Sequence, residues 1–281
     1  MRIIKRKNYY YLQHSFRKDS KVVTKEKYLG KEIPENIEDI KKSFLEECSK
    51  NNLFKLFKKI KNGFQKEWVK YPETIKEKIK EQIAISFTYN TNAIEGSKIT
   101  LEETKELVEY KIAPNKPLRD VKETEAHVSV FLDMLRKKEN FNNELILKWH
   151  KSLFKDTKQD IAGKFRDYHV RVGDYTAPDW QKVNSLMKSL ISFYNKNKIM
   201  NPVEFAARMH YKFERIHPFG DGNGRVGRLI INYILWHANY PMIIIEYKKR
   251  KSYYRALQKD EDNFFNYFTR RYLKVHKKYI K

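Results

Sequence analysis

The chain has almost no cysteine, since Cys48 is the single one among its 281 residues. One thiol excludes an intramolecular disulfide framework and a zinc site built from clustered cysteines. Long apolar runs are missing too, because no stretch approaches the ~20 apolar residues of a membrane-spanning helix. Residues 1–7 lack the apolar core of a signal peptide. The expectation is a cytoplasmic protein with no membrane contact, of one large or two small domains.

Acidic residues are outnumbered by basic ones, and the net charge is +24. Phosphate neutralisation drives nucleic-acid binding, so a charge of this size suggests that class of partner. The excess is concentrated at the two ends, with +8 in residues 1–31 and +9 in residues 248–281. The middle of the chain is therefore only mildly basic. Nucleic acid is not the favoured partner, although the basic ends leave it open.

The most informative stretch is 217–228, HPFGDGNGRVGR. An apolar run of helical length, 229–236, follows it, so the glycine-rich segment predicts a loop that opens a buried helix. The first turn of a helix presents unpaired N–H groups and a partial positive charge. Small residues at Gly222 and Gly224 let an anion approach that backbone. Arg225 and Arg228 lie three apart on one side of the helix, where guanidinium groups pair well with phosphate oxygens.

Two further residues of this stretch suit chemistry on a nucleotide. Asp221 is a lone hard carboxylate, which fits Mg²⁺ better than Ca²⁺ or zinc. His217 precedes the loop, and an imidazole accepts a proton near neutral pH. The alternatives are a helix cap for Asp221 and a structural role for His217. Their combination with the glycines and arginines favours a phosphate site.

The same stretch resembles the signature of the Fic family, HPFx[D/E]GNGRxxR, at every defined position. The resemblance implies a mainly α protein, a helical bundle with a short β-hairpin flap. It implies a protein adenylyltransferase that moves AMP from ATP to a Ser, Thr or Tyr hydroxyl and releases pyrophosphate. Family relatives that act as kinases have lysine at the position of Gly224, which argues against that activity here.

The resemblance assigns chemical roles to seven of the nine matched residues. His217 is the expected general base, and Asp221 is the expected ligand of Mg²⁺ or Mn²⁺. The expected phosphate-binding residues are Gly222, Asn223, Gly224, Arg225 and Arg228.

A second stretch, Thr91 to Gly96, fits the family's inhibitory motif [S/T]xxxE[G/N]. Thr91 and Glu95 lie one turn apart at the end of a helix that begins near residue 73. The resemblance implies that Glu95 pairs with Arg228 and competes with the γ-phosphate of ATP. Glu95 alone would be an ordinary surface glutamate. In some relatives the same glutamate supports removal of AMP, so a de-AMPylase is an alternative function.

Between the two motifs, alternating apolar residues followed by a Gly-Asp turn predict a hairpin over 168–178. The resemblance implies a flap that binds a target segment as an added strand through Val170, Arg171, Val172 and Gly173. The alternative is a surface hairpin that only covers the core. Further on, Tyr254 of the Tyr253–Tyr254 pair is a candidate for stacking on adenine, although paired tyrosines usually serve packing.

The remaining pattern is helical after an N-terminal extension. We expect a hairpin over 8–31, a helix over 35–71, a capping box at Thr100–Glu103, and helices at 118–136, 142–154, 179–195, 202–215 and 222–238. The expected domains are 1–71, an extension; 72–255, the catalytic core with its inhibitory helix; and 256–281, a basic C-terminal helix.

The favoured function is therefore a self-inhibited protein adenylyltransferase whose partners are ATP and a protein that carries a hydroxyl side chain. A homodimer is left open. A non-catalytic nucleotide- or nucleic-acid-binding regulator is the alternative from another class of protein. It is disfavoured because His217 and Arg228 are both present and because only 53 residues follow Arg228.

Overall fold

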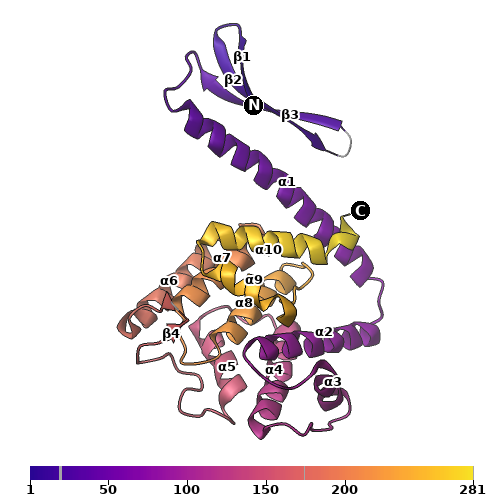
Figure 1. Ribbon diagram of the computed structural model, residues 1–281. Coiled ribbons are helices and arrows are strands. Elements are labelled where there is room, and N and C mark those ends of the chain that lie inside the picture. Colours follow the sequence, from indigo (N-terminus) through magenta and orange to yellow (C-terminus); the bar gives the residue numbers. More distant parts are fainter. Residues whose placement is uncertain (19–20, 174, 281) are drawn as a thin grey trace. The chain divides into compact units, whose positions relative to one another are not determined.

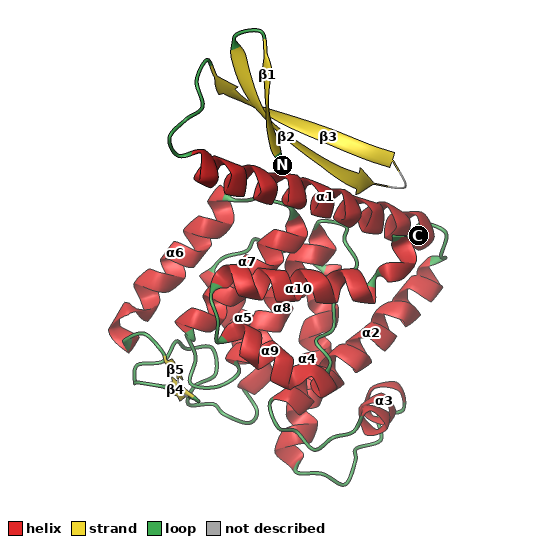
Figure 2. Cartoon of the chain, turned by 45° about the horizontal axis from the view of Figure 1, so that its top comes forward, coloured by secondary structure: helices red, strands yellow, loops and turns green. Residues whose placement is uncertain are grey.

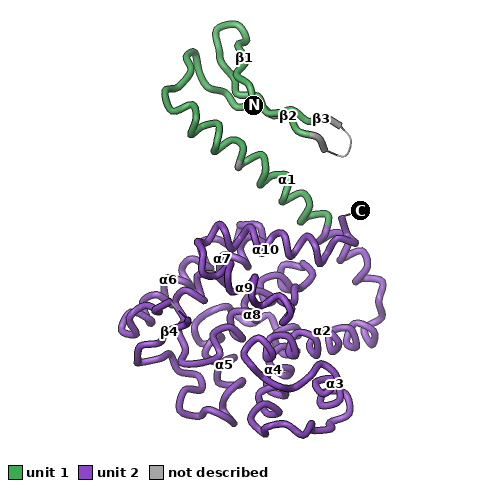
Figure 3. Tube along the Cα trace, in the orientation of Figure 1, with its two compact units in different colours: residues 1–59 green, residues 60–281 purple. Residues whose placement is uncertain are grey.

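The computed structural model describes residues 1–18, 21–173 and 175–280, and the chain divides into two compact units, 1–59 and 60–281 (Figure 3). The predicted domain boundary at 71–72 stays a prediction. Asp19, Ser20 and Asp174, which belong to the turns predicted at 17–20 and 173–174, lie outside the described residues.

The first unit is a three-stranded antiparallel sheet with the first part of a long helix (Figure 2). Its elements are β1 (Arg2–Arg6), β2 (Tyr9–Lys18), β3 (Lys21–Gly30) and the beginning of α1 (Ile37–Trp68). The sheet has one strand more than the predicted hairpin, because the chain reverses at Lys7, which adopts a left-handed φ of 53°. Leu12, Phe44 and Cys48 form the buried core of this unit.

The second unit is almost wholly helical, as predicted (Figure 1). Its helices after α1 are α2 (Glu73–Ile94), α3 (Leu101–Glu109), α4 (Leu118–Arg136), α5 (Asn143–Phe154), α6 (Val183–Lys196), α7 (Pro202–Ile216), α8 (Asn223–His237), α9 (Arg250–Leu257) and α10 (Glu261–Val275). The predicted capping box opens α3, where the Thr100 hydroxyl accepts from the backbone of Glu103. None of the described helices is both long and apolar enough to cross a membrane.

Helix α8 is the centre of this unit and packs against α7, α4, α2 and α5. All seven residues from Leu229 to Leu235 are buried, and Asn232, the polar amide among them, is hydrogen-bonded to the backbone of Ile243. A helix of that pattern is stable only when other helices surround it. The central position of α8 fixes its N-terminus, and the loop before it, among side chains from α2, α4 and α5.

The predicted hairpin is present as β4 (Arg171–Val172) and β5 (Tyr175–Thr176), paired antiparallel. Its backbone ladder continues to Val170, whose carbonyl accepts from Ala177. Arg171, Val172 and Gly173 are exposed. The hairpin is therefore short and open to solvent.

Candidate active site

The loop between α7 and α8 holds the predicted histidine in an unusual backbone conformation. His217 ends α7 with a left-handed φ of 51°. Its side chain is 18% exposed. Burial lowers the pKa of His217, opposed by a hydrogen bond with the backbone of Glu214. The imidazole is therefore neutral at pH 7, and a neutral ring whose Nδ1–H donates to a carbonyl leaves Nε2 as a proton acceptor.

Asn223 closes this loop with its own side chain. Its Oδ1 accepts from the Phe219 N–H at 2.9 Å, and its Nδ2 donates to the Phe219 carbonyl at 2.8 Å. The amide is 2% exposed and fully engaged. What Asn223 offers to an anion is therefore its backbone N–H, at the first position of α8.

At each of the two loop glycines, Gly222 and Gly224, a different side chain occupies the space that a Cβ would need. Gly222 has a φ of +81° and precedes α8, and a Cβ there would overlap the Phe154 ring. A Cβ at Gly224 would instead overlap Oε1 of Glu95 and lie 2.8 Å from Nη1 of Arg228. The space that the sequence assigns to an anion beside Gly224 is thus where the Glu95 carboxylate lies.

Arg228 and the inhibitory motif meet as predicted. Arg228 is 1% exposed, and its Nη2 donates to Glu95 Oε1 at 2.6 Å. Its Nε donates to the Thr91 hydroxyl at 2.5 Å, and Nη2 also reaches the Thr91 carbonyl at 3.2 Å. Residues at the end of α2 therefore accept hydrogen bonds from Nε and Nη2 of Arg228. Tyr254 lies beside this contact, with its hydroxyl 3.4 Å from the Ile94 carbonyl.

Arg225, one turn earlier on α8, pairs with a carboxylate that sequence reasoning missed. Glu123 of α4 accepts from Arg225 Nη1 and is 8% exposed at its side chain. Arg225 contacts Oε2 of Glu123, whereas the other oxygen, Oε1, accepts from Arg119, Thr157 and Lys158 at 3.1 Å each. Burial opposes ionisation of Glu123, but Arg225 and Lys158 hold its pKa below the ordinary value.

Asp221 lies beside this cluster, and donors occupy both of its oxygens. Oδ1 accepts from the Gly222 N–H at 2.5 Å and lies 3.4 Å from Arg225 Nη2. Oδ2 accepts from Lys158 and lies 3.9 Å from Arg119 Nη2. Burial opposes its ionisation, yet Arg225 and Lys158 lower the pKa of Asp221 to about 2. Asp221 is thus a permanent carboxylate at neutral pH.

Sequence reasoning also missed two residues that hold the loop. His150 of α5 accepts from the Gly163 N–H at its Nδ1, so its Nε2–H donates to the Asp221 carbonyl at 3.0 Å. Arg166, 4% exposed, donates to three backbone carbonyls: those of His217 at 2.9 Å, Tyr168 at 2.8 Å and Pro178 at 2.6 Å. Arg166 therefore ties the hairpin to the histidine.

A third carboxylate lies beneath the site. Glu214 of α7 is 11% exposed, with Oε2 4.0 Å from His217 Nδ1 and Oε1 3.9 Å from His210 Nδ1. Among the described residues, that Oε1 has no hydrogen-bond partner. Burial raises the pKa of Glu214 to about 8, and the charge of Glu95 adds to the rise while Arg228 opposes it. Glu214 is therefore largely uncharged at neutral pH.

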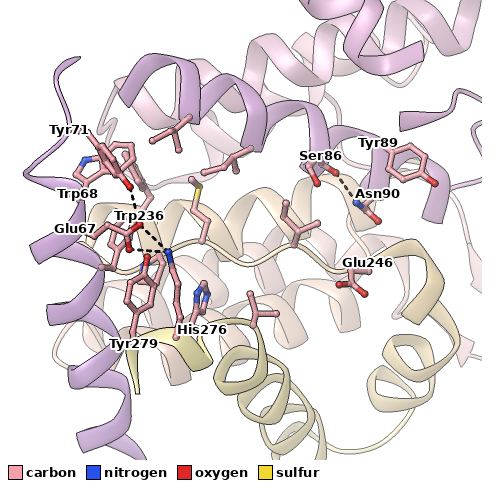
Figure 4. Close-up of a pocket in the computed structure, with 18 of the residues that line it drawn as sticks. Glu67, Trp68, Tyr71, Ser86, Tyr89, Asn90, Trp236, Glu246, His276 and Tyr279 are labelled. Carbon is pink, nitrogen blue, oxygen red and sulfur yellow. Dashed lines mark hydrogen bonds and ion pairs between the residues drawn. The ribbon is translucent and has the colours of Figure 1, made fainter. Parts of the chain in front are cut away.

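Three of the predicted residues, Glu95, Asp221 and Arg225, line a small polar cavity of about 240 Å³ together with Glu123 and Arg119. Small-molecule sites commonly measure roughly 300–1,000 Å³. A roomier cavity of about 670 Å³ lies elsewhere, between α2 and the C-terminal end of the chain, with an aromatic wall that includes Trp68 and Trp236 (Figure 4). None of the predicted site residues lines it. The smaller cavity is therefore the candidate active site.

Known structures define the class of fold. A Fic domain-containing signalling protein from Bacteroides thetaiotaomicron superposes with a TM-score of 0.70 at 26% identity, over 80% of this chain and 97% of its own. Fic-1 from Caenorhabditis elegans superposes with a TM-score of 0.74 at 24% identity, over 86% of this chain and 74% of its own. The second unit therefore has the fold of Fic proteins.

Sequence comparison gives the family. Residues 140–235 match the Fic/DOC family, so this chain carries a domain of that family. The protein adenylyltransferase Fic of Nematostella vectensis is 35% identical over 176 residues, which cover 60% of this chain and 41% of that protein. Relatives from Aedes aegypti and Culex quinquefasciatus are likewise covered over 40% of their length. The chain spans about two fifths of the curated relatives it matches.

Proposed function

We propose that the protein is an adenylyltransferase that transfers AMP from ATP to a protein hydroxyl and is held inactive by Glu95. The observation that carries the proposal is the Glu95–Arg228 contact at the N-terminus of α8. It places a carboxylate where a nucleotide phosphate would otherwise pair with the same guanidinium. The matched relatives named as protein adenylyltransferases support the reaction type.

In the proposed reaction, the target hydroxyl attacks the α-phosphorus of ATP. The new O–P bond forms as the bond from the α-phosphorus to the bridging oxygen breaks, and pyrophosphate leaves. His217 Nε2 takes the hydroxyl proton, which a neutral imidazole does without prior deprotonation. The half-buried Val170 and the exposed residues Arg171, Val172 and Gly173 are the proposed clamp for the target segment. Arg225 and the first N–H groups of α8 receive the phosphates.

A divalent cation fits the donors at Asp221. Two carboxylate oxygens, Asp221 Oδ2 and Glu123 Oε1, already converge on one cation, the ammonium of Lys158. Mg²⁺ is usually held by one or two carboxylates together with substrate phosphates and water. When bound, the ion would neutralise charge on the phosphates. The chain's part is to keep Asp221 ionised, which its pKa of about 2 ensures.

Inhibition follows from competition for Arg228. Nη2 of the buried guanidinium donates to Glu95, so a phosphate can pair with this group only if Glu95 leaves it, whereas Nη1 has no hydrogen-bond partner among the described residues. The small volume of the cavity fits this state, since the Glu95 carboxylate lines it. Release requires the end of α2, from Thr91 to Glu95, to move away from α8.

The reaction is tested with ATP labelled at either the α- or the γ-phosphate, supplied with Mg²⁺ to the Glu95→Gly variant. We expect protein-bound label from the α-phosphate alone, with release of pyrophosphate. Glu95→Gly/His217→Ala is the control and should carry no label. Label from the γ-phosphate would overturn the proposal in favour of a kinase. Loss of AMP from a pre-modified protein only when Glu95 is intact would favour the alternative, de-AMPylation. The cytoplasmic location and a homodimer stay predictions.

A further inference from the structure

Lys158 is a partly buried cation that the reaction above does not use. It lies in the turn after α5, where its N–H donates to the Phe154 carbonyl at 2.8 Å and its ammonium lies 4.6 Å from the centre of the Phe154 ring. Its side chain is 14% exposed. A lysine with so little exposure is positioned by its surroundings, and these comprise an aromatic ring and two carboxylates.

The two carboxylates hold the ammonium unequally. Glu123 is itself buried and keeps three other donors: Arg225, Arg119 and Thr157. Asp221 is 39% exposed at its side chain and faces the polar cavity. Lys158 can therefore release Asp221 and remain paired with Glu123 at 3.1 Å.

The oxygen that Lys158 occupies is the one a metal would need. Asp221 Oδ1 is taken by the Gly222 N–H at 2.5 Å, a contact within the loop itself. Oδ2 is the remaining oxygen, and Lys158 is its closest partner among the described residues. An ammonium at hydrogen-bond distance and a divalent cation cannot share this position, because both the space and the charge conflict.

We propose that Lys158 is a built-in competitor of the divalent cation at Asp221, so that metal binds tightly only together with the nucleotide. The inference rests on the proposed function for the nature of the site. Incoming phosphates attract the ammonium of Lys158 and free Asp221 Oδ2. Lys158 thereby makes metal binding depend on ATP and keeps the empty site from taking up the ion.

The test measures Mn²⁺ binding to the full chain without nucleotide, by the loss of the free-ion signal in electron paramagnetic resonance. We expect Lys158→Met to bind Mn²⁺ on the order of tenfold or more tightly than wild type. Lys155→Met, which removes an exposed lysine of the same turn, should match wild type. Lys158→Met/Asp221→Asn should lose the gain, which assigns the ion to Asp221.

Unchanged or weaker Mn²⁺ binding by Lys158→Met would overturn the inference, provided that the thermal melt shows a folded variant. Adding a non-hydrolysable ATP analogue should narrow the difference between Lys158→Met and wild type. Because the readout is metal binding without reaction, it is separable from the proposed function. A gain in Mn²⁺ affinity in a protein that never transfers AMP would support the competitor and refute the transferase. AMP transfer without a gain in Mn²⁺ affinity would support the transferase and refute the competitor.

Discussion

Two arginines of α8 stand one turn apart, and each pairs with a carboxylate from another helix. Arg225 meets Glu123 of α4, and Arg228 meets Glu95 from the end of α2. Glu123 is 8% exposed and accepts from four donors, whereas Glu95 is 25% exposed and accepts from Arg228 alone among the described residues. We therefore expect the Arg225–Glu123 ion pair to persist and the Arg228–Glu95 ion pair to break more easily. Under the proposed function, these similar ion pairs would serve positioning in one case and inhibition in the other.

The largest effect should come from removing the Glu123–Arg225 ion pair. Glu123→Ala leaves Arg225 buried without its carboxylate, which costs about 3–5 kcal/mol of unfolding free energy. AMP transfer should fall as well, because Arg225 then keeps only the 3.4 Å ion-pair contact with Asp221 to orient it toward the phosphates. Chemical denaturation measures the first effect, with Glu125→Ala on the exposed side of α4 as the control. A Glu123→Ala variant as stable as that control would contradict the comparison.

Removing the Glu95–Arg228 ion pair should raise the rate of AMP transfer. Glu95→Gly frees Arg228 for the γ-phosphate, and the lost hydrogen bond to a charged group is worth about 1.5–3 kcal/mol, or roughly 10- to 150-fold in rate. The rate of AMP transfer is the readout. Glu95→Gln, which keeps the size of the side chain, should give a smaller gain. Equal rates in Glu95→Gly and wild type would remove Glu95 from the account.

Glu214 extends the comparison, because it is a third carboxyl group near Arg228 and, unlike Glu123, is mostly protonated at neutral pH. Its pKa is raised to about 8 in the folded protein, so the folded state holds a proton that the unfolded state has lost above about pH 4.5. Stability from this group is therefore full at acid pH and falls as pH rises toward 8, by at most about 1.4 kcal/mol per pH unit. Glu214→Gln should flatten the decline in melting temperature between about pH 5 and 8, the range between the unfolded and folded pKa values. An unchanged pH dependence of the melting temperature in Glu214→Gln would show that Glu214 is not the group responsible.

The smallest effect should come from Thr91. Thr91→Val removes the hydroxyl that accepts from Arg228 Nε, while the backbone contact to Arg228 Nη2 remains. We expect a loss of about 1 kcal/mol in stability and a gain in AMP transfer well below that of Glu95→Gly. Thr91→Ser keeps the hydroxyl and should behave as wild type in both assays. A larger gain from Thr91→Val than from Glu95→Gly would reverse the ranking.

Sequence reasoning found the parts of the site that lie together in the chain. His217 to Arg228 is one continuous stretch, and Thr91 with Glu95 is a short motif that gains meaning from it. The fold class followed from the resemblance to the Fic family, with which the helical pattern agrees, and the structures of Fic proteins confirm it. The roles of the individual residues stay predictions.

What sequence reasoning missed are single side chains with no local pattern. Glu123 and Lys158 occur among other charged residues, where a charge usually marks a solvated face, and Glu214 looks like any glutamate on a helix. Only the packing of α4, α5 and α7 around the N-terminus of α8 brings them to the site. Strand β1 was missed because its alternating pattern is short and interrupted by charge.

The most direct test of the account is the intact mass of the protein after incubation with ATP and Mg²⁺. Wild type, Glu95→Gly and Glu95→Gly/His217→Ala are compared under identical conditions. The account predicts one added AMP unit on Glu95→Gly and none on the other two, because Glu95 blocks the γ-phosphate and His217 is the base. An equal gain of mass in the double variant, or in wild type, would contradict it.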